Sequence, residues 1–106
     1  MAPGNVLGEF EYLVMLAVMQ LEAEGSAIEV RRLLEEKAER SVSRGALYAT
    51  LERLERKGYV RWETEDATPE RGGIPRRLFR ATGQGVEAVR RSSVAIARLS
   101  EGLSLS

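Results

Sequence analysis

The residues of this chain best suited to chemistry are arginines, which gather in two stretches at residues 44–61 and 71–91. A guanidinium group is always charged, and its donors match the geometry of phosphate and of guanine, so such clusters indicate a polyanionic partner. The net charge is zero, but residues 1–40 hold eight glutamates against four basic residues. The remaining residues therefore carry an excess of four positive charges, and this asymmetry favours nucleic acid as the partner.

Catalysis has few residues to use in this sequence. The 106 residues include no histidine, no cysteine and a single aspartate, Asp66. The usual nucleophile–base pairs and the histidine or cysteine metal sites cannot be built from such a set. Glutamates are plentiful, but we expect them on the outer faces of helices, where they do not converge on a substrate. We therefore expect no enzyme activity, no metal site and no cofactor.

The first arginine stretch coincides with the pattern of an amphipathic helix. Its apolar residues recur at i, i+4 and i+7, which places them on one stripe: Leu47, Leu51 and Leu54. Ser43 is a typical N-cap, and Gly58 after a basic last turn provides a left-handed stop. The outer face of the N-terminal half carries only Gly45 and Ala49, so it can approach a flat partner closely. We interpret residues 43–57 as a recognition helix.

Two further helices are predicted before it. Residues 7–21 and residues 27–39 both repeat apolar side chains at i, i+3 and i+4, the spacing of a buried helix face. The connection at residues 40–42 is short enough to make the second and third helices pack at an angle. This is a helix-turn-helix arrangement.

After Gly58 the period of the sequence changes from 3.6 to 2. Residues 59–64 and 76–81 predict two strands, and the loop between them contains two prolines and a Gly-Gly pair. The tip and return strand of this hairpin carry four arginines: Arg71, Arg76, Arg77 and Arg80. A basic hairpin directly after a recognition helix is a wing, and we interpret Trp62 as part of its packing.

A last helix is predicted over residues 83–101, between the N-cap Thr82 and Gly102. The preceding elements already form a complete unit, so the apolar side of this helix has little to cover within its own chain. We expect a two-fold homodimer in which it packs on the same helix, or on the first helix, of a second copy and spaces two recognition helices about one DNA turn apart. The predicted interface residues are Phe10, Leu13, Val86, Val89, Ile96, Leu99 and Leu103.

The segment from residue 41 to residue 60, SVSRGALYATLERLERKGYV, resembles a known family together with RGG at 71–73, RLF at 77–79 and T-x-x-G at 82–85. These motifs are similar to those of the PadR family of bacterial transcriptional regulators, and the likeness covers roughly residues 7–91. It implies an α+β, mainly α, winged helix-turn-helix repressor with a C-terminal dimerisation helix. Such regulators dimerise through their N- and C-terminal helices and can release DNA on binding a small-molecule effector.

Carried onto this sequence, the resemblance places the DNA-contacting surface on the recognition helix and the wing. The helix residues are Ser43, Arg44, Gly45, Tyr48 and Ala49, and the wing residues are Arg71, Gly72, Gly73, Arg76 and Arg77. The charge pattern adds Arg53 and Arg56 as phosphate or groove-edge contacts, although Arg53 has the alternative of pairing with a glutamate of its own helix. The chain departs from the family at 26–27, where Tyr-Gly is usual, and at 78–79, where tyrosines are frequent. The resemblance therefore does not carry over phosphate contacts by tyrosine hydroxyls at these positions.

This interpretation divides the chain into a DNA-binding domain at residues 1–82 and a dimerisation helix and tail at residues 83–106. Alternatives stay open: a winged helix that binds proteins without specific DNA binding, and arginines that form an ordinary solvated face. An effector site is conceivable where Phe10, Tyr12 and Met15 meet the last helix of the partner, although packing is the simpler explanation. With no apolar run long enough for a membrane span and no basic secretory start, we expect a cytoplasmic location.

Overall fold

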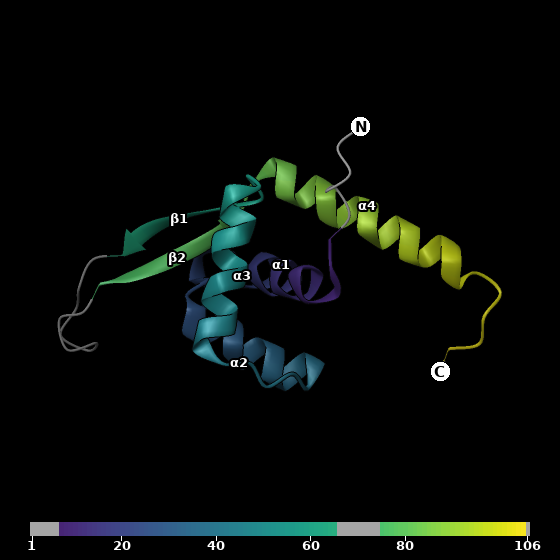
Figure 1. Cartoon of the computed structure of the whole chain (residues 1–106), viewed down its shortest axis with the longest axis horizontal. Coiled ribbons are helices and arrows are strands. Elements are labelled where there is room, and N and C mark those ends of the chain that lie inside the picture. The colour runs from purple at the N-terminus through teal and green to yellow at the C-terminus, as the bar shows by residue number, and fades with distance from the viewer. Residues whose placement is uncertain (1–6, 66–74, 106) are drawn as a thin grey trace.

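The computed structural model describes residues 7–65 and 75–105, which form a mainly helical fold with a small antiparallel sheet. The elements are α1 (Glu9–Leu21), the short 3-10 helix η2 (Glu22–Glu24), α2 (Ala27–Ala38), α3 (Arg44–Arg56), β1 (Val60–Glu65), β2 (Arg76–Ala81) and α4 (Gly83–Ser100). The hairpin projects from one end of the molecule and α4 from the other (Figure 1). In this part of the chain, no helix combines the length and the hydropathy needed to cross a membrane.

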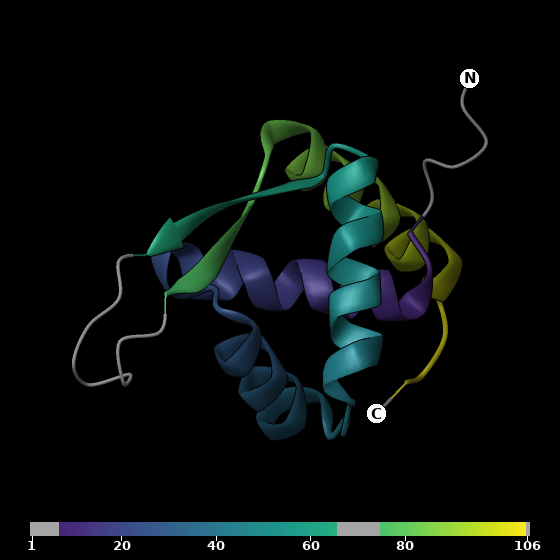
Figure 2. The ribbon, with the colours of Figure 1, turned by 60° about the vertical axis from the view of Figure 1, so that its left-hand side comes forward.

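The core lies where α3 crosses α1 (Figure 2). The three leucines predicted to form the stripe of α3 are fully buried, as are Val14 and Met15 of α1. Burying each such side chain stabilises the fold by about 1.5–3 kcal/mol, so this crossing fixes the orientation of α3. The first helix begins at Glu9 rather than at residue 7, because Gly8 is its N-cap and Leu7 packs into the core before the helix starts.

The hairpin is tied to the body at its base. Its register pairs Val60 with Ala81 and Trp62 with Phe79, and both Val60 and Phe79 are buried. The Phe79 N–H also donates a hydrogen bond of 2.9 Å to the carbonyl of Gly25, between η2 and α2. A Cβ at Gly25 would lie 2.5 Å from the Phe79 carbonyl oxygen, so only glycine allows this approach.

Only the first half of α4 belongs to the core. Thr82 caps the helix as predicted, because its Oγ1 accepts a hydrogen bond of 3.0 Å from the Gly85 N–H. The buried residues of α4 all lie between its start and Ser92: Gly85, Ala88, Val89 and Ser92. Val89 therefore differs from its predicted place on a dimer surface, because its side chain is 6% exposed and packs inside its own chain. The second half of α4 extends beyond the body (Figure 1).

Candidate nucleic-acid interface

The N-terminal half of α3 presents an open face to the solvent. Ser43 is its N-cap as predicted, with Oγ accepting a hydrogen bond of 3.1 Å from the Ala46 N–H. Gly45 and Ala49 are exposed on the outer face, and a Cβ at Gly45 would meet no atom within 4 Å. The turn before α3 is held by Arg31 of α2, whose Nε donates a hydrogen bond of 3.0 Å to the carbonyl of Val42. The backbone at the start of α3 is thus fixed, while the face itself carries little that could obstruct a partner.

A groove of about 460 Å³ lies between the start of α3, the start of α2 and the wing. Its lining residues are Ala27, Ile28, Arg31, Arg44, Tyr48, Pro75, Arg76 and Arg77. Four of the predicted DNA contacts are in this set, two from α3 and two from β2. Ile28, which is 58% exposed, was not among the site residues predicted from the sequence. One feature of the sequence could have pointed to it: position 28 is apolar but lies off the buried stripe of α2, so its side chain is left for a partner.

The predicted arginines differ in how much of their charge is available. Arg44 and Arg56 form no ion pair within residues 7–65 and 75–105. Arg76 is paired with Glu65, with 2.6 Å between Nε and Oε1. Arg53 lies with its Nε 3.9 Å from a carboxylate oxygen of α1, so its partner comes from another helix rather than from its own. Of the predicted wing contacts, Arg71, Gly72 and Gly73 lie outside the described residues.

The last turn of α3 is anchored to α1 through Glu11, which corrects the expectation that the glutamates lie on outer helix faces. Glu11 is only 8% exposed. One carboxylate oxygen accepts a hydrogen bond of 2.9 Å from Lys57 Nζ, and the other accepts one of 3.1 Å from the Gly8 N–H. Burial raises the pKa of Glu11, but the hydrogen bonds from Lys57 and Gly8 and the charges of Lys57 and Arg53 outweigh burial and leave the pKa below its usual value.

Glu11→Gln is expected to lower the free energy of unfolding at neutral pH by about 1.5–3 kcal/mol, because it removes a hydrogen-bonded charge from a buried position. Since the pKa of Glu11 is lower in the folded state than in the unfolded state, its contribution is complete above the unfolded pKa and is lost as the pH falls through the folded pKa. Urea unfolding between pH 7 and pH 3 measures this effect, and the difference between the wild type and the variant should shrink in acid.

The matched control for this prediction is Glu36→Gln, at an exposed position of α2. It removes the same charge and should change the stability by less than about 0.5 kcal/mol. If the difference in unfolding free energy between the wild type and Glu11→Gln stays constant from pH 7 to pH 3, the lowered pKa assigned to Glu11 is contradicted.

Comparison with known proteins places this geometry in a family. Residues 15–91 match the model of the transcriptional regulator PadR-like family. No curated protein matches the chain in sequence. Among solved structures, a PadR-like transcription factor from Bacteroides fragilis is 27% identical with a TM-score of 0.76, and the match covers 87% of this chain and 84% of that chain.

Two further structures share the fold at lower identity. A PadR family regulator from Eggerthella lenta is 24% identical, with a TM-score of 0.69 and coverage of 90% of this chain and 82% of that one. One from Clostridium difficile is 17% identical, with a TM-score of 0.71 and coverage of 88% and 95%. The family match spans most of the chain and includes the helices and the hairpin that form the groove. The chain belongs to the PadR-like family of transcriptional regulators.

Proposed function

We propose that this transcriptional regulator binds operator DNA as a homodimer, with the helix at 43–57 in the major groove and the wing at 67–77 on the minor groove or the backbone. The observation that carries the proposal is the groove between α3 and the wing, in which Arg44 and Arg77 stand without a carboxylate partner among the described residues. Uncompensated arginines beside an unobstructed helix face suit a ligand that is both rigid and anionic. We further propose that the protein acts as a repressor and works in the cytoplasm.

Few side chains at the proposed interface can distinguish one base pair from another. Gly45 and Ala49 offer no hydrogen-bonding side chain to the base edges. Arg44, at the first position of α3, and the wing arginines therefore share the discrimination with DNA shape, while Arg56 contacts phosphate. Arg53 and Arg76 contribute less, because each already faces a carboxylate.

The dimer part of the proposal is supported by the continuity of one face of α4. At about 100° per residue, the exposed residues Ile96 and Leu99 continue the side that Ala88 and Ser92 bury within the chain, and the exposed Leu103 follows just after the end of the helix. Leu99 is 82% exposed although it prolongs a buried stripe. A second copy would cover this overhang together with the partly exposed Phe10 and Leu13, whereas the exposed Val86 lies on a different side of α4 from Leu99 and falls outside this interface.

Leu99→Glu is expected to weaken dimerisation at least about tenfold, because a carboxylate on that face would be buried without a partner. Sedimentation equilibrium over a range of concentrations measures the effect. Ala97→Glu is the matched control, because position 97 is exposed and lies on nearly the opposite side of α4. Equal dimerisation of the two variants, or a monomeric wild type, would remove this face from the interface.

A small-molecule effector remains part of the proposal, but without an assigned site. Met15, one of the three residues expected to line such a site, is fully buried in the core of its own chain. Tyr12 is only partly buried, and the Phe10 ring lies 5.9 Å from the Arg40 guanidinium. These two residues are the part of the expected site that a ligand could reach.

The experiment that tests the proposal is fluorescence anisotropy with a labelled duplex from upstream of the protein's own gene, with an unrelated duplex as control. The expected result is selective binding of the operator duplex. The logarithm of its association constant should fall linearly with the logarithm of the salt concentration, by about 0.9 per phosphate contacted. Equal and weak binding to both duplexes would contradict it and favour the protein-interaction alternative. A reporter placed behind the same DNA should rise in expression on deletion of the gene if the regulator represses.

A further inference from the structure

The wing holds two consecutive arginines in different ways. Arg76 and Arg77 lie next to each other on β2, so the pleat of the strand directs them to opposite faces of the hairpin. The Arg76 Nε donates a hydrogen bond of 2.6 Å to Glu65, the residue opposite it in the register. The guanidinium carbon of Arg77 instead lies 4.3 Å from the ring centroid of Trp62. Within residues 7–65 and 75–105, Arg77 has no ion pair.

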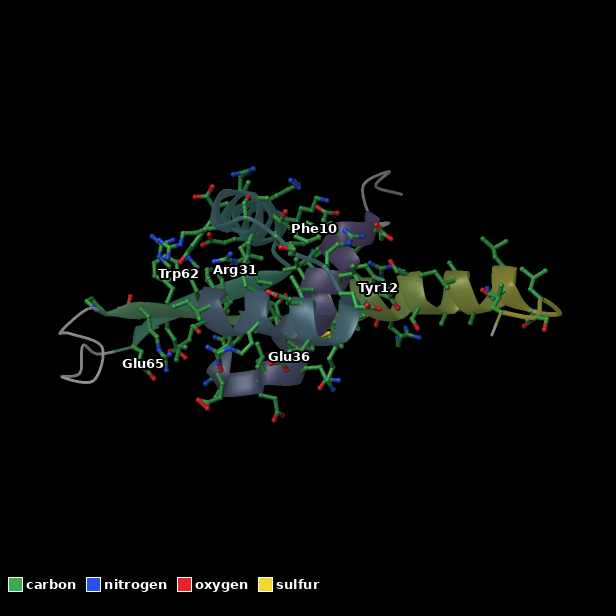
Figure 3. The ribbon with its side chains drawn as sticks, turned by 90° about the horizontal axis from the view of Figure 1, so that it is seen from below. Phe10, Tyr12, Arg31, Glu36, Trp62 and Glu65 are labelled. Carbon is green, nitrogen blue, oxygen red and sulfur yellow. The ribbon has the colours of Figure 1, made fainter. Side chains whose placement is uncertain are left out.

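The face that carries Trp62 and Arg77 is the one that turns towards the helices. Trp62 pairs with Phe79, so Arg77, two residues before Phe79, is its diagonal neighbour on the same face. This face is buried at the base of the hairpin, where Phe79 packs into the core. Figure 3 shows Trp62 on the side of the hairpin where α3 lies and Glu65 on the other side. Arg77 is therefore held along the edge of the groove that Arg44 also lines.

The two ways of holding an arginine have different consequences for an anionic ligand. A carboxylate partner such as Glu65 occupies guanidinium donors and cancels the charge. An indole face restricts the side chain but leaves both the charge and the N–H donors at the guanidinium edge available. An arginine that is ordered before binding also loses less conformational entropy when the ligand arrives.

We propose that Trp62 is a positioning residue that holds the Arg77 guanidinium ready for a DNA backbone phosphate at the edge of the groove. The proposal rests on the DNA binding proposed above and adds a division of labour within the wing. Arg77 is the phosphate contact, Trp62 orders it, and Arg76 is a structural partner of Glu65.

The first test uses the fluorescence of the free protein, because Trp62 is the only tryptophan of the chain. Arg77→Ala should shift the emission of Trp62 and increase its quenching by acrylamide, since it uncovers one face of the indole. Arg61→Ala is the matched control, because it removes the same charge from an exposed position on the other face of the hairpin. Identical spectra for Arg77→Ala and the wild type would overturn the stacking.

The second test measures DNA affinity at several salt concentrations. Trp62→Leu, which keeps apolar bulk but loses the aromatic face, should weaken binding about two- to fivefold with an unchanged salt slope, because the charge of Arg77 remains. Trp62→Phe should lose less. Arg77→Ala should weaken binding further and reduce the slope by about 0.9. In the Arg77→Ala background, Trp62→Leu should have no further effect.

Each alternative outcome has a separate meaning. A Trp62→Leu effect of equal size with and without Arg77 would overturn the proposal and leave Trp62 a structural residue only. If Trp62→Leu does not fold, Arg77→Lys carries the test, because it should keep the salt slope and lose affinity; retention of full affinity would overturn the proposal. A wild type without selective DNA affinity would instead overturn the proposed function, and the fluorescence test would still decide whether Trp62 holds Arg77.

Discussion

Replacing Ala49 by glutamate is expected to abolish selective DNA binding while leaving the fold intact. Ala49 is exposed in the middle of the outer face of α3. In the proposed complex a carboxylate there would face phosphates at short range, and like charges in contact cost several kcal/mol, so the affinity should fall by at least about a hundredfold. The helix tolerates the change, because glutamate is a good helix former and would lie four residues before Arg53.

The measurement is anisotropy with the operator duplex, together with circular dichroism to confirm the helix content and the melting temperature. Ala49→Gln is the matched control, because it has the same size without the charge, and it should lose much less affinity. Binding of Ala49→Glu within about threefold of the wild type, a change below 1 kcal/mol, would exclude this face of α3 from the interface.

Gly85→Ala is expected to destabilise the fold strongly, because α4 has no room for a methyl group at this position. A Cβ at this position would lie 2.1 Å from the carbonyl oxygen of Tyr59 and 2.9 Å from the Met15 side chain. The Tyr59 carbonyl accepts a hydrogen bond of 3.0 Å from the Thr82 N–H, so it cannot move without disturbing the start of α4. Overpacking against backbone costs about 1–3 kcal/mol or more, a large part of the stability of a small domain.

Gly83→Ala is the control for this prediction. It lies in the same first turn of α4, and a Cβ there would meet nothing within 4 Å. Because alanine has a higher helix propensity, Gly83→Ala should leave the stability unchanged or raise it by up to about 1 kcal/mol. Thermal and urea unfolding of the two variants measure the contrast, and equal stabilities would show that the contact between α4 and the Tyr59 carbonyl carries no energetic weight.

The sequence alone determined the α-helices and the two strands of the described residues and the family, while the short 3-10 helix η2 lies where only a helix break was expected. The helix predicted at residues 43–57 is α3 (Arg44–Arg56), and the second strand has its predicted bounds. Ser43 is the N-cap of α3 as predicted, and Gly58 has the left-handed φ of 81° expected of a helix stop. These features depend on periodicity and on capping within a few residues, so the chemistry that decides them is contained in short stretches of sequence.

Only the tertiary structure decided which of the predicted site residues are available. It pairs Arg53 and Lys57 with Glu11 from another helix, and Arg76 with Glu65 across the hairpin, while Arg77 stacks on Trp62. The spacing along the chain cannot give these contacts, because they depend on the angle between α1 and α3 and on which face of the hairpin meets the helices. That choice follows from the joint burial of apolar side chains from all the elements, which is a property of the packed core and not of any one segment.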